Sequence, residues 1–244
     1  MPEGPSIVIL KDSVQEFIGK KVKNASGNTK KLDTSRLIDQ TILDFKTWGK
    51  HFLICFSGFS VRIHLMLFGS YRINEHKNTA PRLSLCFDDG ELNFYGCSVQ
   101  LIESPLDDIY DWTADVMNPD WSSGHALGKL KKHPEMLVCD ALLDQHIFSG
   151  VGNIIKNEVL FRIQLHPLSL VGKLPEHKMN EMITEAVKYS FEFLTWKKEF
   201  TLRKHWEAYS KSVCPRDQVR FRRAHLGKTK RRTFFCEICQ KLYI

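Results

Sequence analysis

The sequence lacks any long apolar run. Its 244 residues contain no stretch that approaches the roughly 18 consecutive apolar residues of a membrane helix. The opening also lacks the positively charged start and apolar core of a secretory signal, and no internal repeat or low-complexity segment is visible. We therefore expect a cytoplasmic globular protein, for which 43% hydrophobic residues are enough to build real cores.

Acidic residues are scarce toward the end of the chain. Residues 197–244 hold 14 Lys or Arg against 4 Asp or Glu, in a chain whose formal net charge is +7. Aromatic residues, among them Trp206, Phe221 and Phe234, are interleaved with these charges. Disordered, solvated tails contain few aromatic side chains. We interpret this segment as a folded nucleic-acid-binding region.

The chain has seven cysteines, an odd number. Cys55, Cys86, Cys97 and Cys139 are scattered through apolar contexts, where a reduced thiol packs as a small hydrophobic group. The other three cysteines crowd into the basic segment, which suggests a separate role for them.

Apolar periodicity predicts a change from strands to helices along the chain. The spacing of Ile7, Leu10 and Val14 predicts an N-terminal amphipathic helix. The predicted strands lie in residues 41–56, 59–73, 81–96 and 97–102, with Asp89-Gly90 as a hairpin turn, and such a series is typical of a sandwich or barrel. The predicted helices lie in residues 133–148, 153–163 and 175–196.

The opening MPEGP places a proline directly behind Met1. Once Met1 is removed, Pro2 carries a secondary amine that can attack an aldehydic sugar carbon and form an iminium. An N-terminal amine has a pKa of about 7.7 to 8.0, so a useful fraction is neutral at physiological pH, and the start of a helix lowers that pKa further. Glu3 can move protons beside it if burial raises its pKa. Taken alone, the pair is explained more simply as a common second residue and a helix-start carboxylate.

The segment FSGVGNIIKNEVLF combines a tight turn with a helix start. Gly150 and Gly152 permit the turn, and Asn153 can cap the helix that follows. Helix-start amides beside an Asn side chain form a natural phosphate site. On spacing alone, an ordinary pair of helices with an Asn cap is the simpler explanation.

The basic segment ends in a metal-ligand pattern. Cys214 and Asp217 are separated by two residues, as are Cys236 and Cys239, with 18 residues between the pairs. This is the layout of a zinc ribbon in which Asp replaces one Cys, and a carboxylate oxygen can ligate zinc. Two alternatives stay open: His225 supplies the fourth ligand, or the hairpin holds no metal and is stabilised by aromatic packing.

Together these stretches resemble the bifunctional DNA glycosylase/AP lyases of the formamidopyrimidine-DNA glycosylase and endonuclease VIII family. The resemblance covers nearly the whole chain in order, through MPEGP, WGKHFL, HLMLFGSYR, DQHIFSGVGNIIKNEVLF and RRTFFCEICQ. It implies a base-excision-repair enzyme that acts on damaged double-stranded DNA, associates with the nucleoid through DNA, and works as a monomer with structural zinc.

The resemblance also assigns roles to individual residues. It implies that Pro2 is the Schiff-base nucleophile, Glu3 the proton shuttle and Lys50 a lysine that contacts phosphates near the lesion and supports base excision. Met66, Leu67 and Phe68 match void-filling residues that wedge into the gap left by a flipped nucleotide, although one of the three is expected in the strand core because strand neighbours face opposite sides. The matching phosphate contacts are His64, Asn153 and Arg231.

Three departures from the family pattern stand out. Ser6 occupies a position where the family usually has Glu, which puts one acidic contact near the lesion pocket in doubt. Asp217 replaces a common Cys, which makes zinc less certain. Residues 199–217 are too short for the extended loop that caps 8-oxoguanine in the formamidopyrimidine branch. The short segment favours oxidised pyrimidines or ring-opened purines as substrates.

The expected architecture is a two-domain α+β protein with DNA in a basic cleft. We expect an N-terminal helix and β-sandwich domain at 1–111 and a linker at 112–128. A helical domain with a helix-two-turn-helix follows at 129–211, and a zinc-finger-like β-hairpin at 212–244. The alternative function is a non-catalytic DNA- or RNA-binding protein that retains this fold. A zinc-ribbon transcription regulator ranks last, because it leaves Pro2 and Lys50 without a purpose.

Overall fold

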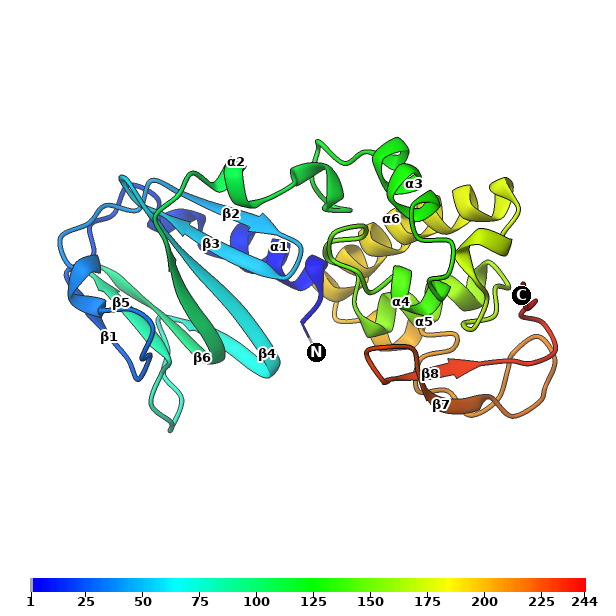
Figure 1. The fold of residues 1–244 in the computed structure, drawn as a ribbon. Coiled ribbons are helices and arrows are strands. Elements are labelled where there is room, and N and C mark those ends of the chain that lie inside the picture. Colours follow the sequence, from blue (N-terminus) through cyan, green and yellow to red (C-terminus); the bar gives the residue numbers. More distant parts are fainter. Residues whose placement is uncertain (1) are drawn as a thin grey trace. The chain divides into compact units, whose positions relative to one another are not determined.

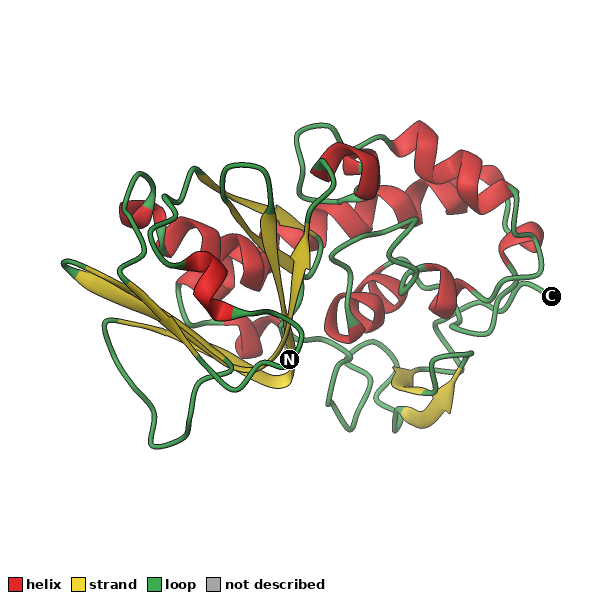
Figure 2. Ribbon diagram, turned by 60° about the vertical axis from the view of Figure 1, so that its left-hand side comes forward, coloured by secondary structure: helices red, strands yellow, loops and turns green. Residues whose placement is uncertain are grey.

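The computed structural model describes residues 2–244. The chain divides into two compact units, Met1–Asp111 and Trp112–Ile244. Figure 2 shows that most strands belong to the first unit and most helices to the second. Each unit has its own hydrophobic core.

The first unit is an antiparallel sheet with one helix packed on it (Figure 1). Helix α1 (Gly4–Ser13) contacts β2 and β3. The six-stranded sheet has the order β1-β5-β6-β4-β3-β2. Its strands are β1 (Asn24–Ser26), β2 (Asp44–Trp48), β3 (His51–Cys55), β4 (Ser60–Ile73), β5 (Leu83–Phe87) and β6 (Gly90–Ile102). Short helices η1 (Gln15–Phe17), η2 (Thr34–Leu37) and α2 (Leu106–Ile109) complete the unit.

The hairpin between β5 and β6 turns one residue earlier than the sequence predicts. Phe87 pairs with Gly90, so Asp88 and Asp89 form the turn and Gly90 begins β6. A Cβ at Gly90 would lie 2.7 Å from Asn74 Oδ1 and 3.0 Å from the Phe17 ring. Gly90 is therefore needed for close packing rather than for the turn.

The second unit is helical and ends in a two-stranded hairpin. Its helices are η3 (Trp112–Ala114), α3 (Ser123–Lys131), α4 (Val138–Ala141), α5 (Asn153–Arg162), η4 (Val171–Lys173), α6 (Glu176–Lys198) and η5 (Leu202–His205). The hairpin pairs β7 (Arg222–Leu226) with β8 (Arg231–Phe235). Within residues 112–128, where the sequence suggests a linker, the chain forms η3 and the start of α3, which Ser122 caps by accepting from His125 N–H at 3.2 Å.

One predicted helix is much shorter than expected. Residues 133–148 contain only α4, because turns occupy both sides of it. Leu137 forms a bridge with Leu170 before α4, and Asp144 Oδ1 accepts from the His146 N–H at 2.8 Å after it. The apolar spacing here reflects burial of successive turns in the core rather than one continuous helix.

Helix α5 is surrounded by the core of the second unit. Ile155, Val159 and Leu160 lie in that core, and α5 packs against both α6 and β8. The helix also buries four polar side chains, those of Asn153, Lys156, Asn157 and Glu158. Buried polar groups require partners, and these residues therefore tie α5 to distant segments. Among the described residues, no helix is long and apolar enough to cross a membrane.

Candidate functional site

The start of α1 holds the first two candidate residues. Pro2 is partly buried just ahead of the helix, and Glu3 at the N-cap is fully buried. Glu3 donates its backbone N–H to Ser6 Oγ at 3.4 Å, and its carbonyl accepts from the Ser6 N–H at 2.8 Å. Ser6 is thus part of the helix cap, and the structure places Pro2 just ahead of α1 and the Glu3 carboxyl at the positive end of that helix.

The turn between β2 and β3 carries Lys50 beside a pair of histidines. Gly49 has a positive φ of 53° and allows the tight turn that exposes part of Lys50. His51 on β3 pairs directly with His64 on β4, and their rings are 5.2 Å apart. The positive charge of Lys50 acts on both rings. Lys50 and His64 therefore belong to one polar group in the first unit, in which Lys50 carries the positive charge.

Burial keeps both histidines neutral at physiological pH. Burial lowers the pKa of His51 to about 3, with further lowering by Arg62, His64 and Lys50. The pKa of His64 is lowered in the same direction, first by burial and then by Lys50 and Arg62. His51 Nδ1 is buried without a hydrogen-bond partner among the described residues. The sequence analysis did not single out His51 as a candidate site residue. Its position directly after Lys50, at the start of a strand, was the feature that could have identified it.

Met66, Leu67 and Phe68 protrude from β4. The β4–β6 register shifts between Leu65 and Ser70, and the three side chains there are 55%, 50% and 88% exposed. A Cβ on Gly69 would lie 2.8 Å from the Gly96 carbonyl oxygen, so Gly69 permits this close approach of the two strands. The expectation that one of the three residues faces the strand core is wrong, because the bulge lifts all of them out of the sheet.

In the second unit, Asn153 is held against the hairpin. Gly152 is the N-cap of α5, and Asn153 is the first helical residue rather than the cap. Asn153 Nδ2 donates to the Arg232 carbonyl at 2.9 Å, while its buried Oδ1 has no partner among the described residues. Arg231, exposed at the start of β8, immediately precedes that carbonyl. The structure thus brings Asn153 and Arg231 into one region.

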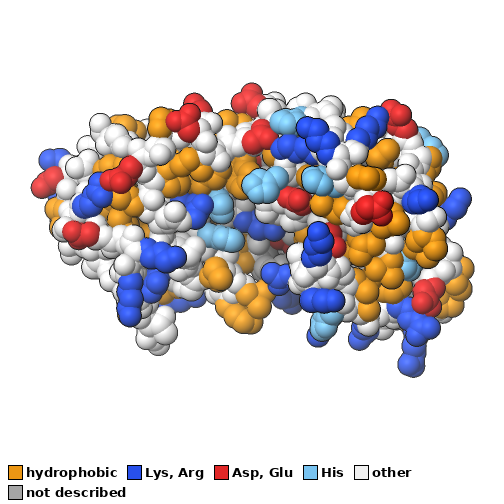
Figure 3. Space-filling model, in the orientation of Figure 1, with side chains coloured by type: hydrophobic (Ala, Val, Ile, Leu, Met, Phe, Trp, Pro, Cys, Tyr) orange, Lys and Arg blue, Asp and Glu red, His pale blue; other side chains and the backbone are white. Residues whose placement is uncertain are grey.

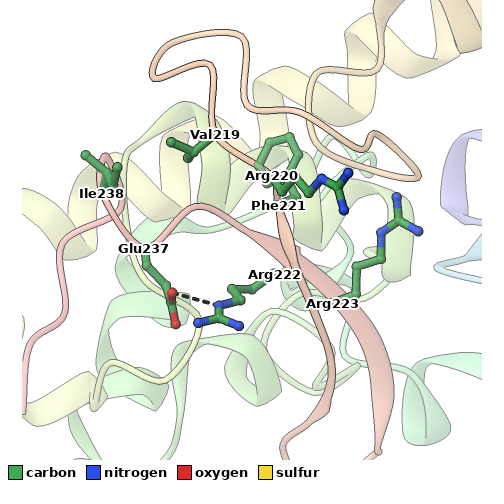
Figure 4. A pocket seen from close by; sticks show the side chains of 7 residues that line it. All are labelled: Val219, Arg220, Phe221, Arg222, Arg223, Glu237 and Ile238. Atoms are coloured by element: carbon green, nitrogen blue, oxygen red, sulfur yellow. Dashed lines mark hydrogen bonds and ion pairs between the residues drawn. The ribbon is translucent and has the colours of Figure 1, made fainter.

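The hairpin and its surroundings are strongly basic. Figure 3 shows Lys and Arg side chains gathered over the β7–β8 end of the second unit. A pocket of about 550 Å³ lies at the base of β7 and is lined by Val219, Arg220, Phe221, Arg222, Arg223, Glu237 and Ile238. Figure 4 shows Arg222 turned toward Glu237, with which it forms an ion pair at 2.8 Å. Arg220 and Arg223 point the other way and leave their positive charge exposed.

Four predicted ligands converge at the base of the hairpin. The ligand atoms of Cys214, Asp217, Cys236 and Cys239 lie within 4.8 Å of one another. The Asp217 Oδ2 is 3.1 Å from the Cys236 sulfur and 3.4 Å from the Cys214 sulfur, and the Cys214 and Cys239 sulfurs are 3.9 Å apart. A tetrahedral zinc ion with bonds of about 2.3 Å holds its sulfurs ~3.8 Å apart. The four residues therefore fit a zinc ion, and His225, exposed within β7, is not among them.

Burial affects the protonation of the cluster when it holds no ion. It raises the pKa of the Cys239 thiol to about 12, so the thiol is protonated at neutral pH when no ion is bound. Hydrogen bonds from Cys236 and then Cys239 lower the pKa of the Asp217 carboxyl. A coordinated metal deprotonates thiols outright, and three sulfurs with one carboxylate are donors that zinc accepts.

Lys156 and Asn157 of α5 were not singled out from the sequence. Lys156 Nζ donates to Thr233 Oγ1 at 2.8 Å, and Asn157 Oδ1 accepts from the Phe234 N–H at 2.7 Å. The signal was their place among apolar residues in NIIKNEVLF, where an exposed helix face would not be expected. These bonds fix β8 along α5.

Comparison with known proteins assigns the family. Residues 1–97 match the formamidopyrimidine-DNA glycosylase N-terminal domain, and residues 115–193 match the formamidopyrimidine-DNA glycosylase H2TH domain. The chain belongs to the formamidopyrimidine-DNA glycosylase and endonuclease VIII family. The resemblance seen in the sequence motifs is thereby confirmed.

The family relatives are longer proteins. The chain is 32% identical over 205 residues to Endonuclease 8-like 3 of Mus musculus, a match that covers 80% of this chain and 34% of the relative. It is 34% identical over 196 residues to Endonuclease 8-like 2 of Bos taurus, covering 74% of this chain and 58% of the relative. The chain thus spans about a third to three fifths of the length of these two relatives.

Solved structures share the fold of the family. A crystal structure of a viral DNA glycosylase has a TM-score of 0.86 at 22% identity, covering 98% of this chain and 100% of that one. The Lactococcus lactis formamido-pyrimidine DNA glycosylase bound non-covalently to DNA with an AP site has a TM-score of 0.85 at 20% identity, covering 98% and 99%. The expected α+β fold, with a β-sandwich, a helical domain and a finger-like hairpin, is confirmed.

Proposed function

We propose that this protein is a DNA glycosylase and AP lyase of base excision repair. The observation that carries the proposal is the pairing of Pro2 with a fully buried Glu3 at the start of α1, in a chain that belongs to this family. An N-terminal amine at a helix start has a lower pKa than a lysine side chain and therefore loses its proton more easily. A buried carboxyl beside it can exchange protons with the substrate.

The reaction uses the Pro2 amine after Met1 has been removed. The amine nitrogen attacks C1′ of the damaged nucleotide, the N-glycosidic bond breaks and the base leaves with a proton. The amine nitrogen then loses its proton and the C1′–O4′ bond breaks, with O4′ taking up a proton, which opens the sugar to an iminium. The iminium acidifies C2′, whose proton is removed as the 3′ phosphate departs, and loss of the 5′ phosphate follows by δ-elimination. Glu3 moves the protons in these steps, and water then releases the sugar fragment from Pro2.

Cationic and polar groups in both units bind the DNA backbone. Lys50 and His64 lie in one group in the first unit, and Asn153 and Arg231 lie together in the second. One hydrogen of Asn153 Nδ2 is used by the Arg232 carbonyl, and the other is available for a phosphate oxygen. Such contacts hold DNA of any sequence and make binding depend strongly on salt.

The protruding residues of β4 fill the space left by the damaged nucleotide. Phe68 is 88% exposed, with Met66 and Leu67 beside it. Exposing three large apolar side chains to water is unfavourable for a free protein. Inserted among base pairs, they replace the stacking lost when a nucleotide is flipped out.

Oxidised pyrimidines and ring-opened purines are the proposed lesions. The segment between α6 and the hairpin is pinned, because Glu158 accepts the backbone N–H groups of Glu207, Ala208 and Tyr209 at 2.9, 3.1 and 2.7 Å. A segment held in this way is poorly suited to act as a long loop that closes over 8-oxoguanine. This supports the substrate preference inferred from its short length.

Zinc is the proposed metal of the finger. Cys214, Asp217, Cys236 and Cys239 would hold it, and a bound ion would supply structural cross-linking rather than reaction chemistry. The Arg216 guanidinium donates to the Phe161 carbonyl at 2.7 Å, so the cluster is joined to the end of α5. A zinc ion bound by the four ligands would therefore keep the base of the hairpin fixed to the helical unit.

Incision of a set of damaged duplexes tests the proposed activity. The protein, shown by mass spectrometry to lack Met1, is incubated with duplexes that carry thymine glycol, ring-opened guanine, 8-oxoguanine or an abasic site. We expect cleavage of the first two and of the abasic duplex to β,δ-elimination products, with slower cleavage of 8-oxoguanine. Binding of the abasic duplex without any cleavage would instead identify a non-catalytic DNA-binding protein.

A further inference from the structure

The turn of the β7–β8 hairpin is anchored by a carboxylate far away in the sequence. The backbone N–H of Lys228 donates to both oxygens of Asp140, at 2.9 and 3.0 Å. Asp140 lies in α4 and is 9% exposed. A hydrogen bond to a charged acceptor is about twice as strong as one between neutral groups. This contact is thus a firm attachment between the helical core and the hairpin turn.

The residue before Lys228 is shaped to admit this carboxylate. Gly227 has a positive φ of 71°, and a Cβ built on it would lie 2.2, 2.6 and 2.7 Å from the three carboxyl atoms of Asp140. Its three nearest neighbours are therefore all Asp140 atoms. Glycine is required here both by the backbone conformation and by the space that Asp140 fills.

The rest of β8 is attached independently of Asp140. Asn153 binds the Arg232 carbonyl, Lys156 binds Thr233, and Asn157 binds the Phe234 N–H. Toward the turn these attachments stop. Among residues 2–244, Asp140 is the side chain that bonds to the backbone of residues 227–230. Arg231 lies between the anchored turn and the anchored strand, so its backbone is held from both sides.

We propose that Asp140 is a positioning residue for DNA binding, because it fixes the hairpin turn and thereby the place of Arg231. This inference rests on the proposed function, in which Arg231 contacts a phosphate. A turn that is already ordered loses little conformational freedom when DNA binds.

The first experiment compares Asp140→Ala and Asp140→Asn with the wild-type protein. Binding to an abasic-site duplex is measured by fluorescence anisotropy over a series of salt concentrations, and the cleavage rate is measured at saturating enzyme. We expect Asp140→Ala to weaken binding about tenfold and to reduce the salt slope by about 1, the value of one lost phosphate contact. Asp140→Asn keeps one acceptor oxygen, so its loss should be smaller.

The cleavage rate separates positioning from general damage. Asp140→Ala should cleave bound DNA within about twofold of the wild-type rate, because the Pro2 and Glu3 groups lie in the other unit. Glu135→Ala is the charge-matched control, since Glu135 is an exposed acid near α4 with no bond to the hairpin. It should bind DNA at least as well as the wild type.

A double-mutant cycle tests the contact itself. Gly227→Ala forces a methyl group onto the Asp140 carboxyl, and this conflict disappears in the Asp140→Ala/Gly227→Ala protein. We expect Gly227→Ala to weaken DNA binding strongly in the wild-type background and much less in the Asp140→Ala background. Equal losses in the two backgrounds would overturn the assignment, because they would show that Asp140 and Gly227 act separately.

Hydrogen exchange provides a readout that needs no DNA. The Lys228 amide should exchange faster in Asp140→Ala, by about tenfold or more, while the Phe234 amide held by Asn157 keeps its wild-type rate. Faster exchange with unchanged DNA affinity would overturn the positioning role while leaving the proposed function intact. A wild-type protein that fails to bind abasic DNA would overturn both.

Discussion

Glu3 and Ser6 are joined by a backbone-to-side-chain hydrogen bond, from the Glu3 N–H to Ser6 Oγ at 3.4 Å. The Ser at position 6, where this family usually has Glu, therefore has a structural explanation in the cap of α1. The bond helps hold Glu3 at the start of the helix, next to Pro2. Glu3 itself is fully buried, and its carboxyl is the acid that the proposed chemistry needs.

Replacing Glu3 should separate the two halves of the reaction. Glu3→Gln keeps the shape of the side chain but cannot exchange a proton, so release of thymine glycol should slow by about 10² to 10⁴. Iminium formation at an existing abasic site needs no base release and should persist. Single-turnover rates on thymine glycol and abasic duplexes test this. Equal losses on both substrates would contradict the assigned role, and Ser6→Ala serves as a control that weakens the cap alone.

Arg231 should contribute affinity without lesion preference. Its side chain is exposed at the start of β8, where a phosphate contact carries no base information. Arg231→Ala should weaken binding to damaged and undamaged duplexes by a similar factor and lower the salt slope by about 1. Arg222→Ala is the matched control, because Arg222 is already paired with Glu237 and should change binding less. An unchanged salt slope in Arg231→Ala would exclude the phosphate contact.

Asp217 should be required for full zinc binding. The Asp217→Ala protein loses one of four converging ligands, so its zinc should be removed by a chelator at a concentration at which the wild type keeps one ion per chain. Metal analysis after dialysis measures the zinc content. Glu237→Ala is the control, since this exposed acid next to Cys236 lies outside the cluster. Equal zinc retention in Asp217→Ala and the wild type would show that another group is the fourth ligand.

His51 should make the folded state sensitive to acid. Burial lowers its pKa to about 3, whereas an unfolded histidine has a pKa near 6.5. The unfolded state thus binds the proton more readily, and the stability contributed by neutral His51 is present above about pH 6.5 and is lost as the pH falls toward 3. His51→Gln should show a flatter dependence of its melting temperature on pH in this window. Parallel curves for the two proteins would contradict the lowered pKa.

Local patterns predicted most of the regular elements, because burial on one side imposes a period on the sequence. The N-terminal helix, β4 and the long α6 were found in this way. Residues 133–148 were predicted wrongly, because buried turns produce apolar spacing that resembles a helix. The prediction of a turn at Asp89-Gly90 was also wrong. Gly90 is required because it packs closely against the Phe17 ring and Asn74.

Contacts between residues far apart in the chain could not be predicted from the sequence. Glu158 is buried because it binds backbone N–H groups of residues 207–209, and Asp140 is buried beside a turn 88 positions away. No local spacing specifies such partners. The four metal ligands could be predicted because their pairs are close in sequence, and the structure brings them together. The catalytic and DNA-binding roles of the candidate residues stay predictions.

Covalent trapping at Pro2 is the most direct test of the proposed chemistry. The protein without Met1 is mixed with abasic-site DNA and sodium borohydride, which reduces an iminium to a stable amine, and the cross-linked peptide is identified by mass spectrometry. We predict a cross-link on the Pro2 nitrogen, and none in a protein that retains Met1, because an acylated proline nitrogen is an amide. A cross-link on a lysine, or no cross-link in a protein that binds the DNA, would contradict Pro2 as the nucleophile.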